Sequence, residues 1–207
     1  MDDGRSRCGW VGEDARMRAY HDEQWGVPVH GDRELFAKLI LDGAQAGLSW
    51  ATILHRQEGY FRAFDGLDPE KMAAYGDADI ERLLADPGII RNRAKVRSAI
   101  ANAQAYLRLR EEEGSFAEWL WRFVDGQPVQ NAWRREADRP AVTPLAEEVS
   151  RQLRRRGFSF VGPTIVYAFM QAVGMVNDHV VTCFRHAALG GPPPAARPRA
   201  AGRGGRK

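Results

Sequence analysis

The chain has 207 residues, enough for one globular unit or two small helical lobes with a proper core. Its hydrophobic fraction of 44% is ordinary for a soluble protein, and no stretch reaches the roughly 18–20 apolar residues that a membrane-spanning helix needs, so no such helix is expected. The formal net charge is +3, but residues 190–207 contribute +5, which leaves −2 for residues 1–189. The positive charge therefore does not by itself indicate a nucleic-acid surface on the folded part.

The two ends of the chain predict little structure of their own. Residues 1–8 contain no apolar signal core, and there are only two cysteines, so a cytoplasmic protein without a disulfide between Cys8 and Cys183 is expected. Residues 190–207 consist mainly of Gly, Pro, Ala and Arg, which predicts a disordered basic tail that attracts phosphate without specificity.

Helical periodicity is weak in residues 8–31, which are rich in aromatic, histidine and cysteine side chains. This composition predicts an irregular segment that is held by something other than its own hydrogen bonds. Residues 32–41 predict an amphipathic helix with Asp32 as its N-cap. Asp42 falls at the edge of the apolar stripe of that helix, so its carboxylate is expected to be partly buried or to line a cleft.

A tight turn is predicted next, because Gly43 and Gly47 let the chain leave the helix. Ser49 can then cap a second helix that begins at Trp50. The turn would bring the Asp42 carboxylate and the Trp50 ring together at a helix–turn–helix corner. The alternative interpretation is an exposed aspartate at a helix end and a tryptophan in the core.

The rest of the chain contains helical patterns and no convincing strand, so the predicted fold class is all-α. Helices are expected over residues 50–64, 69–75, 79–86, 92–113, 116–124, 143–156, 164–173 and 177–184, with a loop over residues 125–143.

Two cysteines and two histidines form a candidate metal site. His179 and Cys183 are four residues apart, which on the predicted helix puts both side chains on one face. Cys8 and His21 lie in the irregular N-terminal segment, and the four together make a complete tetrahedral zinc set. Four protein ligands leave no open position for water, so such a zinc is structural. The alternative is a buried cysteine accompanied by surface histidines.

Residues 84–95 predict a helix, a glycine-containing hairpin and a second helix. Backbone N–H groups around Gly88 and Ile90, together with the dipole of the second helix, can bind a DNA phosphate. Arg91 and Lys95 add positive charge nearby, and contacts of this kind position DNA without reading its sequence. The alternative is an ordinary helix–helix turn with a solvated basic face.

Several long and rare strings occur together and in order over roughly residues 8–186. They are CGW (8–10), YHDEQWGVP (20–28), QAGLSW (45–50), GIIR (88–91), RGF (156–158), FVG (160–162) and VNDH (176–179). With these strings the chain resembles the constitutive type I 3-methyladenine DNA glycosylases.

The resemblance implies a helical DNA-repair glycosylase of the helix-hairpin-helix superfamily with one structural zinc. Its zinc ligands carry over to Cys8, His21, His179 and Cys183, and its hairpin to residues 84–95. A zinc-clipped lobe is then expected from residues 1–31 packed with residues 141–189. Residues 32–140 are expected to form the lobe with the hairpin and the base pocket.

The pocket acid of the family falls on Asp42, where the family pattern usually has glutamate, and its stacking tryptophan falls on Trp50. Tyr20, Trp10 and Trp25 match further aromatic positions around the pocket. Met17 stands where many members have tyrosine.

The resemblance implies a monomer that acts on double-stranded DNA with an alkylated purine. It excises N3-methyladenine by hydrolysis of the N-glycosidic bond after base flipping. Asp42 is the candidate catalytic residue, with a role in recognising the base and no assigned role in activating water. Met17 and Asp42 support the alternative of a non-catalytic, zinc-containing module that binds DNA damage. A zinc hydrolase with Asp42 as its base is a third interpretation, which the closed metal shell disfavours.

Overall fold

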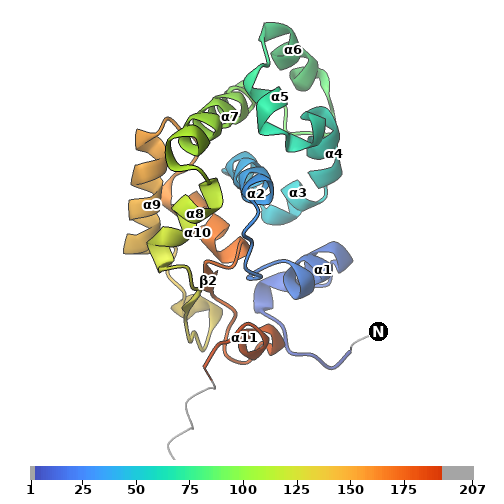
Figure 1. The fold of residues 1–207 in the computed structure, drawn as a ribbon. Helices are drawn as coiled ribbons and strands as arrows, with labels where there is room; N and C mark the ends of the chain where they lie inside the picture. The colour runs from blue at the N-terminus through green and yellow to red at the C-terminus, as the bar shows by residue number, and fades with distance from the viewer. Residues whose placement is uncertain (1–2, 193–207) are drawn as a thin grey trace, which may run out of the picture.

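The computed structural model describes residues 3–192, which fold mainly into helices (Figure 1). The α-helices are α1 (Ala15–Glu23), α2 (Asp32–Gln45), α3 (Trp50–Leu54), α4 (Gln57–Ala63), α5 (Pro69–Ala73), α6 (Asp77–Ala85), α7 (Arg93–Glu113), α8 (Phe116–Trp121), α9 (Pro144–Arg155), α10 (Pro163–Ala172) and α11 (Phe184–Ala188). Two short strands, β1 (Val129–Gln130) and β2 (Val176–Asn177), pair in parallel. The predicted all-α class is confirmed as a mainly helical fold, to which these two short strands are an addition.

Helix α2 lies in the middle of the fold and packs against α3, α7, α8 and α10 (Figure 1). Its apolar stripe, which includes Leu35 and Leu39, is fully buried in the main hydrophobic core. The helix runs past the predicted end, through Asp42, to Gln45, because Gly43 is itself helical and buried. The predicted turn then occurs at Gly47, which has a φ of +75°.

The sequence predicts Asp32 as the N-cap of α2, but Gly31 holds that position. The Asp32 carboxylate turns instead to the start of α8. It accepts hydrogen bonds from the Ser115 hydroxyl at 2.7 Å and from the N–H groups of Phe116 at 3.0 Å and Ala117 at 2.8 Å. Burial opposes ionisation of Asp32, but the bonds from Ala117, Ser115 and Phe116 outweigh it and lower its pKa. The carboxylate therefore joins the starts of two helices.

Asp32→Ala is expected to lower the free energy of unfolding by about 2 kcal/mol at pH 7, because α8 loses its acceptor for two N–H groups. The folded pKa of Asp32 is depressed, so this contribution is fully present above the unfolded pKa and is lost as the pH falls through the folded value. Urea unfolding at pH 7 and at pH 3 measures both effects. A penalty that does not shrink in acid would contradict the assignment. Asp77→Asn, at the exposed start of α6, is the matched control.

The segment predicted to be irregular, residues 8–31, contains helix α1. Asp14 caps it by accepting hydrogen bonds from the N–H groups of Arg16 at 2.7 Å and Met17 at 3.1 Å. The helix is only nine residues long and buries three side chains, which is too few for a clear periodic pattern. The predicted helix over residues 50–64 is divided into α3 and α4 by a break at His55 and Arg56.

The predicted last helix, over residues 177–184, is wrong. Asn177 belongs to β2, and its carbonyl accepts a hydrogen bond from the Asn131 N–H at 3.3 Å. Cys183 is extended, with φ −74° and ψ 136°, and stands immediately before α11. Strand pairing with the segment predicted as a loop, residues 125–143, has overridden the local helical preference.

The N-terminal segment lies beside the C-terminal elements (Figure 1). The Phe184 N–H donates to the Ser6 carbonyl at 2.9 Å, and the Val29 N–H donates to the Val173 carbonyl at 3.1 Å. The division into two lobes stays a prediction. Residues 193–207, most of the predicted basic tail, lie outside the described residues. Among residues 3–192, no helix is long and apolar enough to cross a bilayer.

Candidate functional site

The aromatic and acidic residues predicted for the base pocket line one cavity of about 420 Å³. They are Trp10, Tyr20, Trp25, Asp42 and Trp50, and Met17 joins them. The structure therefore brings together side chains that are up to 40 positions apart in the sequence, from α1, α2, α3 and the loops next to them. The size of the cavity and its four aromatic side chains are typical of a site for a flat organic molecule.

The aromatic rings of the pocket support one another. The Tyr20 and Trp50 ring centroids lie 5.0 Å apart with the planes tilted by 41°. Trp10 meets Trp25 edge to face at 5.0 Å. Ser49 holds Trp50 at the first position of α3, because its hydroxyl accepts a hydrogen bond from the Thr52 N–H at 3.2 Å. The predicted cap of α3 is confirmed.

Asp42 is 1% exposed and forms an ion pair with Lys38, one helical turn earlier on α2. Burial raises the pKa of Asp42 and lowers the pKa of Lys38, and the attraction between the two groups opposes both shifts. Sequence reasoning missed Lys38, although its i,i+4 spacing from Asp42 was a usable signal.

Two buried polar atoms at the pocket have no hydrogen-bond partner among the described residues. They are Oδ2 of Asp42 and Nε1 of Trp50. Buried polar groups are nearly always paired in folded proteins, so unpaired ones in a cavity indicate where a ligand would bond. The free carboxylate oxygen of Asp42 is an acceptor for such a ligand.

Residues 125–143, predicted only as a loop, contribute to the pocket through Arg139. Its guanidinium lies 5.8 Å from the centre of the Trp25 ring and donates to the Asp178 carbonyl at 3.2 Å. The same segment carries Glu136, whose carboxylate accepts a hydrogen bond from the Gly9 N–H at 3.0 Å. The loop thus joins the N-terminal segment to the chain around Asp178.

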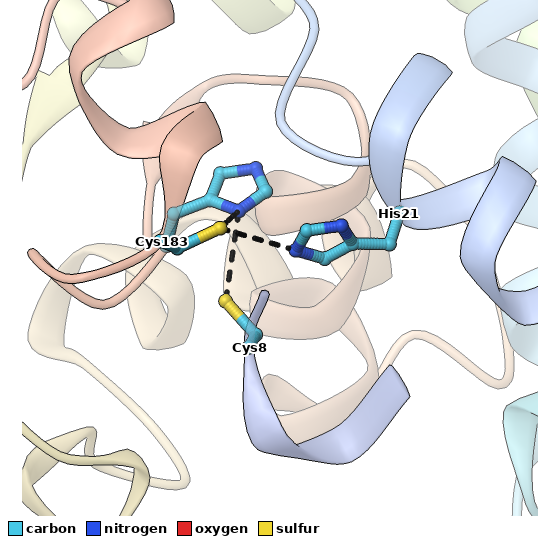
Figure 2. Close-up of side chains that lie close together, drawn as sticks. Cys8, His21 and Cys183 are labelled. Carbon is cyan, nitrogen blue, oxygen red and sulfur yellow. Dashed lines mark hydrogen bonds between the residues drawn. The ribbon is translucent and has the colours of Figure 1, made fainter. Parts of the chain in front are cut away.

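Cys8, His21, His179 and Cys183 converge, with one ligand atom of each within 4.8 Å of the others. Figure 2 shows Cys8, His21 and Cys183 pointing toward one another. All four are buried, with at most 3% of their surface exposed. The sulfur of Cys183 lies 3.4 Å from Nε2 of His21 and 3.4 Å from Nδ1 of His179, and the sulfur of Cys8 lies 3.6 Å from the same Nδ1. The prediction that His179 and Cys183 share a helix face is wrong. A turn closed by a hydrogen bond from the Cys183 N–H to the Val180 carbonyl brings them together.

The three sulfur–nitrogen distances fit a tetrahedral zinc, whose ligand atoms stand about 3.3–3.8 Å apart when they lie about 2.0–2.3 Å from the metal. The outer nitrogens of both histidines are held as well. Nδ1 of His21 bonds to the Asp22 carboxylate at 2.7 Å, and Nε2 of His179 bonds to the Trp25 carbonyl at 3.1 Å. Partners of this kind orient metal-binding imidazoles. The bond between Cys8 and Cys183, with those from His179 and His21, lowers the pKa of Cys183, whereas the same bond and burial raise the pKa of Cys8. Cys183 is therefore the sulfur of the pair that ionises first.

Helices α6 and α7 are joined by a hairpin over residues 86–92, which packs on α4. A Cβ on Gly59 would lie 2.3 Å from the Gly88 carbonyl oxygen, so this close approach needs glycine. The Gly88 N–H donates to the Asp86 carboxylate at 2.6 Å, and the Ile90 N–H donates to the Tyr60 hydroxyl at 3.2 Å. Both N–H groups therefore have partners inside the protein.

The predicted cations of the hairpin differ in their surroundings. Nζ of Lys95 donates to the carbonyls of Ala44 at 2.8 Å and Ala46 at 2.7 Å, which ties α7 to the end of α2. Arg91 is exposed, and within residues 3–192 its side chain has no hydrogen-bond or ion-pair partner. Of the two, Arg91 is the one whose charge is available at the surface.

The methyladenine glycosylase family model matches residues 10–186. The chain is 46% identical to DNA-3-methyladenine glycosylase 1 of Escherichia coli over 86% of this chain and 95% of that protein. It resembles a crystal structure of 3-methyladenine DNA glycosylase I with a TM-score of 0.86 and 46% identity, over 87% of this chain and 100% of the other. A second solved structure, which describes 3-methyladenine recognition by 3-methyladenine DNA glycosylase I of Staphylococcus aureus, matches with a TM-score of 0.83 and 37% identity, over 86% of this chain and 94% of that one. The chain therefore belongs to the methyladenine glycosylase family.

Proposed function

We propose that this protein is a DNA glycosylase that removes 3-methyladenine from alkylated DNA by hydrolysis of the N-glycosidic bond. The observation that carries the proposal is the cavity in which the buried Asp42 carboxylate adjoins the rings of Trp50 and Tyr20. The E. coli and S. aureus relatives carry the name of this activity, which supports the assignment.

The chemistry of the lesion suits such a pocket. A purine methylated at N3 in DNA is positively charged, and this charge already weakens its glycosidic bond. The main tasks of the protein are then to extrude the nucleotide from the duplex and to hold the damaged base. Selectivity would follow from the charge and shape of the lesion and from its easier unstacking.

Each pocket residue has a role in this proposal. Trp50 stacks on the flipped base, and Tyr20 makes a further stacking or polar contact. The electron-rich face of each ring contributes about 0.5–2 kcal/mol toward a cationic ligand. Asp42 accepts a hydrogen bond from the base edge, through the oxygen that has no partner among residues 3–192. Trp10 and Trp25 enclose the pocket, and no residue is assigned to activating water.

Structural zinc is part of the proposal, with Cys8, His21, His179 and Cys183 as its ligands. The convergence of the four buried ligand atoms, the three sulfur–nitrogen distances of 3.4–3.6 Å and the hydrogen-bonded outer nitrogens of both histidines support it. The metal would join the N-terminal segment to the chain before α11. With four protein ligands it has no open position, so the reaction does not use it.

DNA contact is proposed at a helix-hairpin-helix formed by α6, the hairpin and α7. The 21-residue helix α7 points its positive dipole end at the hairpin, where Arg91 is exposed. Gly88 and Ile90 stay candidates for contact with the DNA backbone because they form the turn between the two helices. Their N–H groups, however, already have partners within the protein. Lys95 would have to leave the carbonyls of α2 to reach a phosphate.

Release of free bases from methylated duplex DNA, separated by chromatography, tests the proposed function. Free 3-methyladenine above the spontaneous background is the expected result. Damage-selective binding by folded, metal-loaded protein without any release would favour the alternative, a non-catalytic damage-binding module. The proposal also includes that the protein is a monomer in solution, as expected from the sequence. Size-exclusion chromatography with light scattering, which measures the molar mass, tests this.

Arg91→Ala is expected to weaken DNA binding and to reduce the slope of log K against log salt by about 0.9, the value for one phosphate contact. Fluorescence anisotropy with a labelled duplex over a salt series measures this slope. Arg108→Ala, an exposed arginine toward the other end of α7, should leave the slope unchanged. Equal slopes for Arg91→Ala and the parent protein would remove Arg91 from the DNA interface.

A further inference from the structure

The base pocket already contains a cation of its own. Nζ of Lys38 lies 3.9 Å from the centre of the Trp50 ring and 5.9 Å from that of Tyr20. It also pairs with the Asp42 carboxylate. The ammonium group thus uses the two aromatic faces and the acid that the proposed function assigns to the positively charged base.

We propose that Lys38 is a resident cation that competes with cationic bases for the pocket and so sets its preference between charged and neutral ligands. This inference rests on the proposed function only in its choice of ligand, a cationic methylated purine. One aromatic face and one carboxylate serve one cation at a time, because a second cation a few ångströms away is repelled. A cationic base must therefore displace Lys38 before it can stack on Trp50 and bond to Asp42.

The structure also contains a place for the displaced side chain. Lys38 lies between the base pocket and a neighbouring cavity of about 350 Å³, and it lines both. Glu34 lines the neighbouring cavity and stands four residues before Lys38 on α2, as Asp42 stands four residues after it. Glu34, Lys38 and Asp42 therefore follow one another along one face of the helix.

This arrangement gives Lys38 two acidic partners, on opposite sides along the helix axis. Paired with Asp42, it occupies the base subsite. Turned toward Glu34, it leaves the subsite open and keeps a carboxylate partner. Its flexible four-carbon stem and 16% side-chain exposure allow this movement without refolding of α2. Glu34 is accordingly a positioning residue for ligand entry and does not touch the base.

The test is calorimetric titration with two small probes. One is the 3,9-dimethyladeninium cation, whose N9 methyl group replaces the sugar and keeps the ring charged. The other is neutral 9-methyladenine. Lys38→Met is expected to bind the cation about tenfold more tightly than the parent protein and to change the Kd of the neutral probe much less. Lys38→Arg keeps the charge and should show no tightening, and Glu34→Gln should weaken binding of the cation. Lys71→Met, an exposed lysine on α5, controls for net charge.

A folded Lys38→Met protein that binds the cation no more tightly than the parent would overturn the inference. Circular dichroism checks the fold, because this variant leaves Asp42 without its partner. Lys38→Gln keeps a hydrogen-bond donor at the same place and replaces Lys38→Met if that variant does not fold. Base release from methylated DNA by the parent protein is measured in parallel. Tighter cation binding without any base release would retire the proposed function alone, whereas base release with unchanged cation binding would retire the role of Lys38 alone.

Discussion

Replacing Asp42 by asparagine is expected to lower kcat/KM for 3-methyladenine release by roughly 10- to 150-fold, the equivalent of about 1.5–3 kcal/mol for a hydrogen bond to a charged group. Asparagine keeps the shape of the side chain and loses the negative charge that complements a cationic base. The buried position makes this loss large, because the pocket excludes the water that would screen the charge. Single-turnover release from methylated duplex DNA measures the effect.

A control is needed because Asp42→Asn also leaves Lys38 without its ion-pair partner. Breaking one side of a buried pair can destabilise a protein by about 3–5 kcal/mol, which by itself would lower activity. The double variant Lys38→Met with Asp42→Asn removes the pair entirely and separates the two causes. If this double variant folds and releases 3-methyladenine at the rate of Lys38→Met alone, Asp42 has no part in recognising the base.

Replacing Cys183 by serine is expected to remove the bound zinc and to lower the apparent stability by about 4 kcal/mol, the linkage value for a ligand at a thousand times its Kd. For a domain of this size the melting temperature should then fall by about 10 °C. The physical reason is that the four ligands join the N-terminal segment to the chain before α11, and all four are buried. Without the metal, the four buried ligand side chains lose the bonds that hold them to one another.

Elemental analysis of protein purified without chelators, together with thermal unfolding, measures both parts of this expectation. One zinc per chain is expected for the parent protein and none for Cys183→Ser. His30→Gln changes an exposed histidine outside the cluster and should keep the metal. Limited trypsin digestion shows which part of the chain is released. Cleavage after Arg7 should become faster only in the variant that has lost the metal. Metal-free parent protein with an unchanged melting temperature would rule out a structural zinc.

The sequence by itself determined the helical class, most helix positions, the four members of the cysteine–histidine cluster and five of the side chains that line the pocket, but not Lys38 or Arg139. Caps such as Ser49 before α3 and Thr143 before α9 are local signals, because side chain and N–H groups lie within three residues. Cys8 and Cys183 are the only cysteines of the chain, so they could be matched to one cluster without knowledge of their path in space.

Only the tertiary structure decided how those residues meet. His179 and Cys183 converge through a turn. The helix expected from residue 177 does not form, because residues 176–177 pair as strand β2 with a segment about 47 residues away, and α11 begins only after Cys183. Asp32 leaves its own helix uncapped and bonds to the start of α8, 83 to 85 residues further on. Such contacts depend on which segments pack together, and local propensity carries no information about them.

Lys38 shows the same limit within the pocket. Its spacing from Asp42 indicates an ion pair on a helix, but the ring of Trp50 reaches the pair from a different helix. An ion pair of this kind on the surface would contribute little to stability. Burial beside two aromatic rings turns it into a cation in a binding site, because the low dielectric of the pocket strengthens each charge interaction. The face of Trp50 that Lys38 covers is closed to a second cation while Lys38 stays there.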